Sequence, residues 1–252
     1  MRSFLLGAER EGAFNIPFKV ERGGGVPTAR DYVQDGLIAM WDGIENAGFD
    51  SHDGTSSVWR DLVGGNNMSV VGADGWTTNA YVLNGTNSRY ASGTLGIDLS
   101  ADFSFEFCAV IHGVNESGRF YGYNLSNGNA NFCDCGLRNY DSTRLFSYVG
   151  LGLPATGASL AAINPPLGVL LSSSTTRSGG NSEFFSNGAS VFSASQSAIS
   201  TNRNSVFTIG GGHNGKYGAV ADVHCMRVYN RALTPAEIAA NYAVDKARFN
   251  LQ

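Results

Sequence analysis

The strongest constraint on the fold lies near the end of the chain, where a strand-like run leads directly into a helix start. Thr234 is a residue type that favours the N-cap, Pro235 suits the first helical position, and Glu237 follows three residues after the cap. This is the spacing of a capping box, in which two side chains bind backbone N–H groups that would otherwise be unpaired. The sequence therefore predicts a helix that begins at Pro235.

That helix has an apolar face, formed by Ile238, Tyr242 and Phe249, so it should pack onto the part of the chain that precedes it. The preceding part has the composition of a β protein. Of 252 residues, 33 are Gly, 6 are Pro and 15% are charged, against about 25% charged in an average globular chain. Short strands joined by Gly, Asn and Ser turns give this composition.

Strand-like runs recur from Asp35 onward. The run 36–41 is continuously apolar, as in a strand buried on both faces. Phe103, Phe105 and Phe107 alternate and should share one face of a strand, and Asn187-Gly188 is a strong hairpin signal. Strands are also predicted over residues 81–83, 88–91, 103–111, 118–124, 143–149, 168–172, 182–186, 206–209 and 219–229. This spacing favours an all-β sandwich of two antiparallel sheets, with a short C-terminal helix.

The first 33 residues differ from the rest and are predicted to form an extended N-terminal arm or linker (1–33), followed by the sandwich over 34–252. Residues 1–30 contain five basic and three acidic side chains among several large apolar ones. Gly23-Gly24-Gly25 before Val26-Pro27 is typical of a joint between segments. Either its own sandwich or a neighbouring subunit would hold the arm, and the sequence leaves both open.

Charge and hydropathy exclude several classes of function. A formal charge of −4 without a basic stripe makes nucleic acid an unsuitable partner. No stretch approaches the roughly 18 apolar residues of a membrane span, so no membrane insertion is expected. The apolar run near Met1 stops at Glu9, which is too short for a secretory signal. We therefore expect synthesis in the cytoplasm without a signal peptide.

The four cysteines predict reduced thiols. Cys133 and Cys135 are separated by one residue, so in a strand they face the same side and cannot bridge comfortably. Cys108 and Cys225 lie inside apolar runs, where a free cysteine behaves as a small apolar residue. A single Cys-x-Cys pair is not a zinc-site spacing.

Several segments, in this order, resemble the laminin-G-like branch of the concanavalin A-like lectin/glucanase superfamily. The matching segments are residues 35–41, 59–64, 81–90, 103–107, 185–188 and the C-terminal helix with the strand before it. The resemblance covers roughly residues 35–248 and implies a jelly-roll sandwich of two curved antiparallel sheets. It implies no single activity, because this fold hosts lectins, adhesion modules, glycosidases and structural subunits.

The resemblance also raises the question of calcium. Many relatives have paired acidic residues just before the run that is Arg227-Val-Tyr-Asn here, and one of them helps to hold Ca²⁺. This chain has His224 and Cys225 at those places, and neither is a hard oxygen ligand. We therefore expect no metal and no cofactor, although loop oxygens are available from Asp42, Asp50, Asp53 and Asp61.

Catalytic signatures are weak, and we do not expect an enzyme. Retaining glucanases of the superfamily carry a Glu-x-Asp-x-x-Glu array, which places acid and nucleophile on one face of a strand. Here Glu106 stands alone between Phe105 and Phe107. The histidines lie in no recognisable catalytic motif, although a Ser-His-Asp or Cys-His set distant in sequence stays open.

Binding has better support, because sugar recognition needs an aromatic face together with amides or carboxylates for hydroxyl groups. The richest segment runs over residues 119–131. The candidate ligand-binding residues there and just downstream are Tyr121, Tyr123, Asn124, Asn127, Asn129, Arg138 and Tyr140. A second candidate is the rim loop 46–54, with Asp50, His52 and Asp53. Trp41 and Trp59 are predicted to be core residues and Trp76 a loop anchor.

Three functional hypotheses follow. The first is a non-catalytic adhesion or carbohydrate-binding component of a bacteriophage or prophage virion, held to other subunits through residues 1–33. Its partners would be a glycan or cell-surface polysaccharide and further copies of the chain, in a homo-oligomer. The second is a free bacterial glycan-binding lectin. The third is a glycoside hydrolase, for which a carboxylate pair in a cleft would be required.

Overall fold

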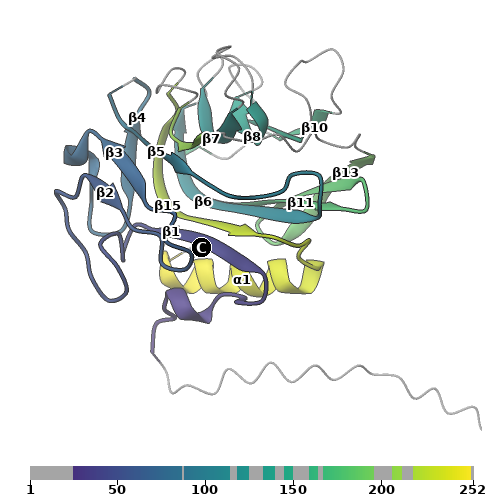
Figure 1. Cartoon of the computed structure of the whole chain (residues 1–252), viewed down its shortest axis with the longest axis horizontal. Helices are drawn as coiled ribbons and strands as arrows, with labels where there is room; N and C mark the ends of the chain where they lie inside the picture. Colours follow the sequence, from purple (N-terminus) through teal and green to yellow (C-terminus); the bar gives the residue numbers. More distant parts are fainter. Residues whose placement is uncertain are drawn as a thin grey trace, which may run out of the picture.

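The computed structural model describes residues 25–250, apart from residues 87, 114–117, 125–132, 140–144, 150–158, 164–166, 196–205 and 212–217. For residues 123, 124, 133–139, 145–149 and 159–163 it describes the backbone alone. Two antiparallel sheets stack face to face, and a helix covers the outer face of one of them (Figure 1). The predicted all-β sandwich closed by a C-terminal helix is therefore confirmed.

The first sheet has seven strands. Its order is β1 (Leu37–Asp42), β15 (Val220–Tyr229), β6 (Phe103–Gly113), β11 (Leu170–Ser178), β12 (Asn181–Ser186) and β13 (Ala189–Ser195), and β4 (Tyr81–Asn84) pairs with β15 as well. Helix α1 (Pro235–Arg248) packs on this sheet. Because the helix covers the outer face, β6 is buried on both faces along most of its length.

The second sheet has eight strands. Its order is β10 (Ser159–Ile163), β9 (Leu145–Val149), β8 (Cys133–Asn139), β7 (Arg119–Asn124), β14 (Val206–Ile209), β5 (Tyr90–Thr94), β3 (Met68–Val71) and β2 (Val58–Trp59). Two short 3-10 helices, η1 (Ala29–Asp31) and η2 (Ala73–Gly75), lie in the connections.

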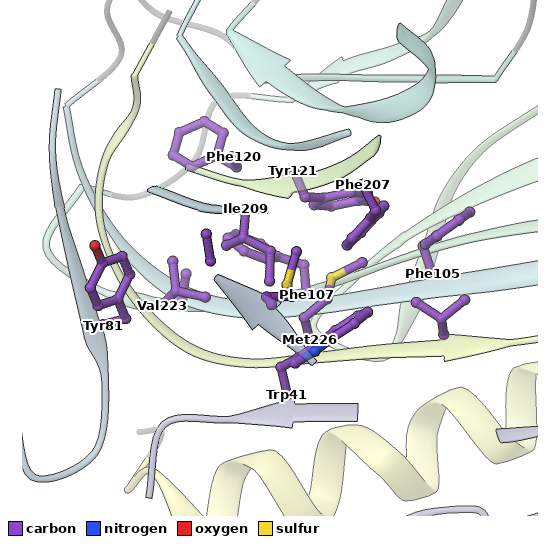
Figure 2. Packing of buried hydrophobic residues seen from close by; sticks show 14 of the residues in the cluster. Trp41, Tyr81, Phe105, Phe107, Phe120, Tyr121, Phe207, Ile209, Val223 and Met226 are labelled. Atoms are coloured by element: carbon purple, nitrogen blue, oxygen red, sulfur yellow. The ribbon is translucent and has the colours of Figure 1, made fainter. Parts of the chain in front are cut away.

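Aromatic rings fill the space between the sheets (Figure 2). Phe103, Phe105 and Phe107 alternate along β6 and are all fully buried in this core, as their spacing predicted. The ring of Phe207 from the second sheet stacks on Trp41 at 5.5 Å and on Phe105 at 5.9 Å between centroids. These offset contacts join the two layers.

Helix α1 begins as predicted. The Thr234 hydroxyl accepts a hydrogen bond from the Glu237 backbone N–H at 3.3 Å, and the Thr234 N–H donates to the Glu237 carboxylate at 2.8 Å. Both halves of the capping box are therefore present. Ile238 is buried, and Tyr242 and Phe249 are partly buried against the same sheet, which confirms the predicted apolar face.

A charged cluster lies buried between α1 and the first sheet. Arg227 on β15 donates two hydrogen bonds to Asp245 of the helix, at 2.6 and 2.9 Å, and a third to Glu106 on β6, at 2.9 Å. Asn241 donates to both Glu106 and the Tyr229 hydroxyl. The sequence did not predict this cluster, because its members are up to 139 positions apart (Glu106 to Asp245) and only the fold brings them together.

The part of the predicted arm that the structure describes packs on its own domain. The Tyr32 hydroxyl donates to Asp245 at 2.8 Å, and the Val33 N–H donates to Asn241 at 2.8 Å. Ala29 and Tyr32 are both 2% exposed. Residues 1–24 lie outside the described residues.

The smaller predictions have mixed outcomes. Asn187 and Gly188 join β12 to β13 with φ angles of 50° and 77°, as a two-residue hairpin requires. Trp41 and Trp59 are core residues, and the indole N–H of Trp76 donates to the Ser56 carbonyl at 2.8 Å. Strands β2, β3, β8, β10 and β13 were not predicted, because their sequences are short or mix small and polar residues without clear alternation.

Two of the cysteines are described with their side chains. Cys108 and Cys225 occupy paired positions on β6 and β15, and both are buried free thiols, as predicted. Burial raises the pKa of both thiols. Cys133 and Cys135 lie on β8, where the backbone alone is described. Within the residues that the structure describes, no helix combines the length and apolar composition needed to cross a bilayer.

Candidate functional site

The first predicted site, around residues 119–140, is partly corrected by the structure. Tyr121 is 2% exposed, and its ring lies 5.4 Å from the ring of Phe107 between centroids (Figure 2). It is a core residue, so the prediction that it presents a face to a sugar is wrong. The prediction failed because a Tyr on a strand can face either the core or the solvent, and the face follows only from the register of the strand.

The other members of that site are described only in part. Tyr123 and Asn124 end β7, where the register pairs Tyr123 with Phe207 of β14, and Arg138 lies on β8. The backbone alone is described at these three positions, and Asn127, Asn129 and Tyr140 lie outside the described residues. Their ligand-binding role stays a prediction.

The rim loop is described completely, and its predicted residues are exposed. Asn46, which is fully buried, fixes the loop: its side chain accepts from the Asp53 N–H and donates to the Asp53 carbonyl, both at 2.8 Å. The Asp53 carboxylate accepts from the Thr55 N–H and hydroxyl, which lowers the pKa of Asp53. Asp53 is therefore an exposed, ionised acceptor in a defined position.

The same loop has a tight turn before Asp53. Gly48 has a φ of 127° and Asp50 a φ of 58°, which is uncommon for a residue with a side chain. His52 has its Nδ1 3.1 Å from the Gly43 carbonyl. Because a carbonyl can only accept, Nδ1 carries the proton in this contact. The turn thus presents the side chains of Asp50, His52 and Asp53 to solvent.

The structure adds two residues that the sequence interpretation missed. Phe49 is 39% exposed, and the Arg30 guanidinium lies 4.2 Å from the centre of its ring. Arg30 also pairs with the Asp50 carboxylate at 3.3 Å. Phe49 lies within the predicted loop and could have been included for its aromatic ring, whereas Arg30 had been assigned to the arm. We call Arg30, Phe49, Asp50, His52 and Asp53 the rim cluster.

The rim cluster brings together, on the protein surface, the kinds of side chain that can bind a sugar. An aromatic ring can cover the apolar face of a pyranose, while carboxylates and a guanidinium bind hydroxyl groups. The cation–π contact holds the guanidinium against the ring before any ligand arrives. The carboxylates of the cluster have partners in the protein: Asp50 pairs with Arg30, and Asp53 accepts from Thr55.

Glu106, the carboxylate that a glycosidase hypothesis would need, is not accessible. It is 1% exposed beneath α1 and accepts hydrogen bonds from Arg227, Asn241 and Ser174. Burial raises its pKa, opposed by the positive charge of Arg227. A substrate cannot reach this carboxylate while the helix is in place.

The loop aspartates considered for calcium have protein partners. Asp42 pairs with Arg248 at 2.6 Å and accepts the N–H groups of Ile44 and Glu45. Asp61 accepts backbone N–H groups from four residues: Met40, Val63, Gly64 and Asn66. Within the described part of the chain, no three His, Cys, Asp or Glu side chains gather where they could hold a metal ion.

The fold and the rim cluster define a class, a two-sheet jelly-roll sandwich with a polar, aromatic cluster in a loop at its edge. Residues 84–239 match the family model described as concanavalin A-like lectin/glucanases superfamily. This chain belongs to that superfamily, as its sequence resemblance indicated. No curated protein matches the chain.

Solved structures share the fold at low sequence identity. Trypanosoma rangeli sialidase in complex with sialic acid aligns with a TM-score of 0.61 and 17% identity, over 87% of this chain and 34% of the sialidase. The binding domain of botulinum neurotoxin DC in complex with SialylT aligns with a TM-score of 0.57 and 11% identity, over 84% and 52% of the two chains.

A third structure has nearly the same extent as the matched part of this chain. Domain 4 of AbnA, a GH43 extracellular arabinanase from Geobacillus stearothermophilus, in complex with arabinotriose, aligns with a TM-score of 0.53 and 18% identity. The alignment covers 82% of this chain and 98% of that domain, whereas this chain spans about a third of the sialidase. At these identities the likeness shows the fold alone.

Proposed function

We propose that this chain is a non-catalytic carbohydrate-binding and adhesion module that binds a glycan at the rim cluster. The observation that carries the proposal is the exposed ring of Phe49 beside Arg30 and the carboxylates of Asp50 and Asp53. The named ligands of the three structural neighbours, which are sialic acid, SialylT and arabinotriose, support a glycan as the class of ligand.

The test is binding of the purified chain to an array of bacterial and host glycans. Phe49→Ala should weaken binding to the best glycan by about tenfold or more, since losing an aromatic platform costs on the order of 1.4 kcal/mol. Phe192→Ala is a matched control, because Phe192 on β13 is also 39% exposed but lies outside the cluster. Equal losses in both variants, or no loss in either, would contradict the assignment of the site.

The absence of catalysis is part of the proposal. Two observations support it: Glu106 is buried, and the carboxylates of Asp53 and Asp50 bind Thr55 and Arg30. A glycan that binds should be recovered intact after long incubation, as measured by mass spectrometry. Hydrolysis that co-purifies with the chain and disappears in Asp50→Asn or Asp53→Asn would instead favour the glycoside hydrolase.

We further propose that the module belongs to a bacteriophage or prophage virion, where residues 1–24 hold it to other subunits. Two observations support this proposal: an apolar and basic arm precedes the sandwich, and Cys108 and Cys225 inside the sandwich are free thiols. Deletion of residues 2–24 should abolish incorporation and leave the sandwich folded. The deletion stops before Ala29 and Tyr32, because these residues pack under α1.

A free bacterial lectin is the alternative, and the same deletion separates the two. If the shortened chain assembles as well as the full chain, or if the full chain is found only as an unattached glycan-binding protein, the virion proposal is wrong. Glycan binding at the rim cluster would be unaffected by that outcome.

A further inference from the structure

An open groove lies beside α1. It has a volume of about 550 Å³ and lies between residues 27–35 and the helix. Its walls are mainly apolar and include Pro27, Val33, Ala240 and Val244. Such a groove next to the entry of the chain into the fold would leave apolar surface exposed unless something covers it.

The arm contains a segment of matching character. Phe14, Ile16, Phe18 and Val20 alternate, so in an extended conformation their side chains lie on one side. Pro17 in the middle of the segment favours an extended backbone and needs no partner for an N–H group. The segment therefore offers one apolar face of the kind that an apolar groove can bury.

Charge favours the same pairing. Asp31, Asp35 and Glu237 lie around the groove. Arg231 pairs with two of these carboxylates, at 2.9 Å to Asp35 and 2.6 Å to Glu237. One positive charge against three negative ones leaves the edge of the groove acidic. Lys19 lies within the arm segment, and Arg22 follows it after Glu21, so this part of the arm has a net positive charge. These would lie near carboxylates if the apolar residues entered the groove.

Chain length favours the arm of the same molecule over that of a neighbour. Six residues separate Val20 from Pro27, which lines the groove. The seven steps from Val20 to Pro27 span at most about 25 Å, so the C-terminal end of the segment stays close to the groove. A tether of this length gives an effective concentration in the millimolar range, which a separate molecule does not reach in dilute solution.

We propose that residues 14–20 of the arm dock, within the same chain, into the groove between residues 27–35 and α1. The docked segment covers the apolar walls with the side chains of Phe14, Ile16, Phe18 and Val20. It places Lys19 near the acidic edge of the groove. This inference concerns a different surface from the rim cluster and holds whether or not the chain binds a glycan. With residues 14–20 docked on their own chain, residues 1–13 remain to hold the module to other subunits.

The test is limited trypsin digestion of the native full-length chain, with cleavage after Lys19 compared to cleavage after Arg2. Docking should slow cleavage after Lys19, because proteolysis tracks the population of the open form. Ala240→Arg places a bulky cation on the groove wall and should raise the rate of cleavage after Lys19 about tenfold. This corresponds to a loss of roughly 1.4 kcal/mol in the free energy of docking. Ala239→Arg is the matched control, since Ala239 is exposed on the same helix and does not line the groove; its rate should stay within about twofold.

A second variant guards against a groove substitution that disturbs the fold. Ile16→Asp lies outside the sandwich and should release the segment as Ala240→Arg does. The proposal is overturned if Lys19 is cut as fast as Arg2 in the unmodified chain, or if neither variant speeds cleavage. It is also overturned if protection of Lys19 requires a dimer, as measured by light scattering, since the arm would then dock on a second copy.

Discussion

Arg227 is the residue on which the attachment of α1 depends. It is 1% exposed and binds Asp245 on the helix and Glu106 on β6. The Tyr32 ring also lies 3.9 Å from its guanidinium. One side chain thus ties the C-terminal helix, the first sheet and the segment before β1 together.

Replacing Arg227 should therefore be strongly destabilising. Arg227→Met leaves two buried carboxylates without their cation, which costs on the order of 3–5 kcal/mol. Arg231→Met is the control: Arg231 makes ion pairs with Asp35 and Glu237 but is 26% exposed, so its loss should cost about 1 kcal/mol or less. Urea unfolding measures both, and similar costs for the two variants would contradict this role of Arg227.

His224 should make stability depend on pH. Burial lowers its pKa, and its Nδ1 lies 2.9 Å from the Asn79 carbonyl, with the Phe249 ring 4.9 Å from its own. The unfolded chain, with a histidine pKa of about 6.5, therefore binds a proton more readily than the folded one. The free energy of unfolding should fall as the pH drops below about 6.5.

Unfolding measured at pH 7.5 and 5.5 checks this prediction. His224→Gln should remove part of the difference between the two values. A slope that is identical in the unmodified chain and in His224→Gln would show that His224 is not responsible.

At the scale of single elements, α1 shows how local sequence can specify structure. Thr234, Pro235 and Glu237 specify its N-terminal cap, and these residues lie within one helical turn. Glu237 also binds Arg231, and this hydrogen-bonded partner lowers the pKa of Glu237 to about 2.

The cap should weaken in acid. Because the folded pKa of Glu237 lies below its unfolded value, its contribution is present above about pH 4.5 and is lost as the pH falls toward 2. Glu237→Gln should be less stable than the unmodified chain at pH 7, by about 1 kcal/mol, and the difference should shrink between pH 4.5 and 2. Lys246→Gln, exposed on the same helix, should show no such trend in thermal unfolding.

Elements whose signals are local were predicted well, and those that depend on register were not. The helix cap, the Asn187-Gly188 turn and the alternation of β6 were all recognisable within a few residues. β13 was missed because Ala189–Ser195 is mostly Ser and Ala, with only Val191 and Phe192 to mark it. Tyr121 was misassigned because the face of a strand follows from pairing with distant strands.

The candidate site shows the same division. Asp50, His52 and Asp53 could be predicted because they lie together in a polar loop. Arg30 could not, because it lies 19 positions before Phe49 and 20 before Asp50 and only the fold brings it next to them. The residues that give a loop its chemistry can thus come from segments that the sequence places in another unit.

At the scale of the whole molecule, the sandwich protects its thiols. Cys108 and Cys225 are both fully buried, and burial raises the pKa of each, so the reactive thiolate is scarce as well as inaccessible. Their chemistry should therefore report opening of the fold rather than local motion.

In a Cys133→Ser/Cys135→Ser chain, the two remaining thiols should react with a thiol reagent only as fast as the protein unfolds. Rates measured in increasing urea should follow the unfolding rate measured by fluorescence. Rapid reaction in native buffer, while the fluorescence is unchanged, would contradict the burial of these residues.

The two ends of the described fold lie close together at the C-terminal end of α1. The Arg248 guanidinium donates to the Tyr32 hydroxyl at 3.3 Å, so the entry and exit of the chain lie side by side. Domains with neighbouring ends tolerate circular permutation and insertion into a surface loop of a host protein. This chain could therefore be inserted into a host protein through two short connections, with the loop that carries Phe49 left exposed to solvent.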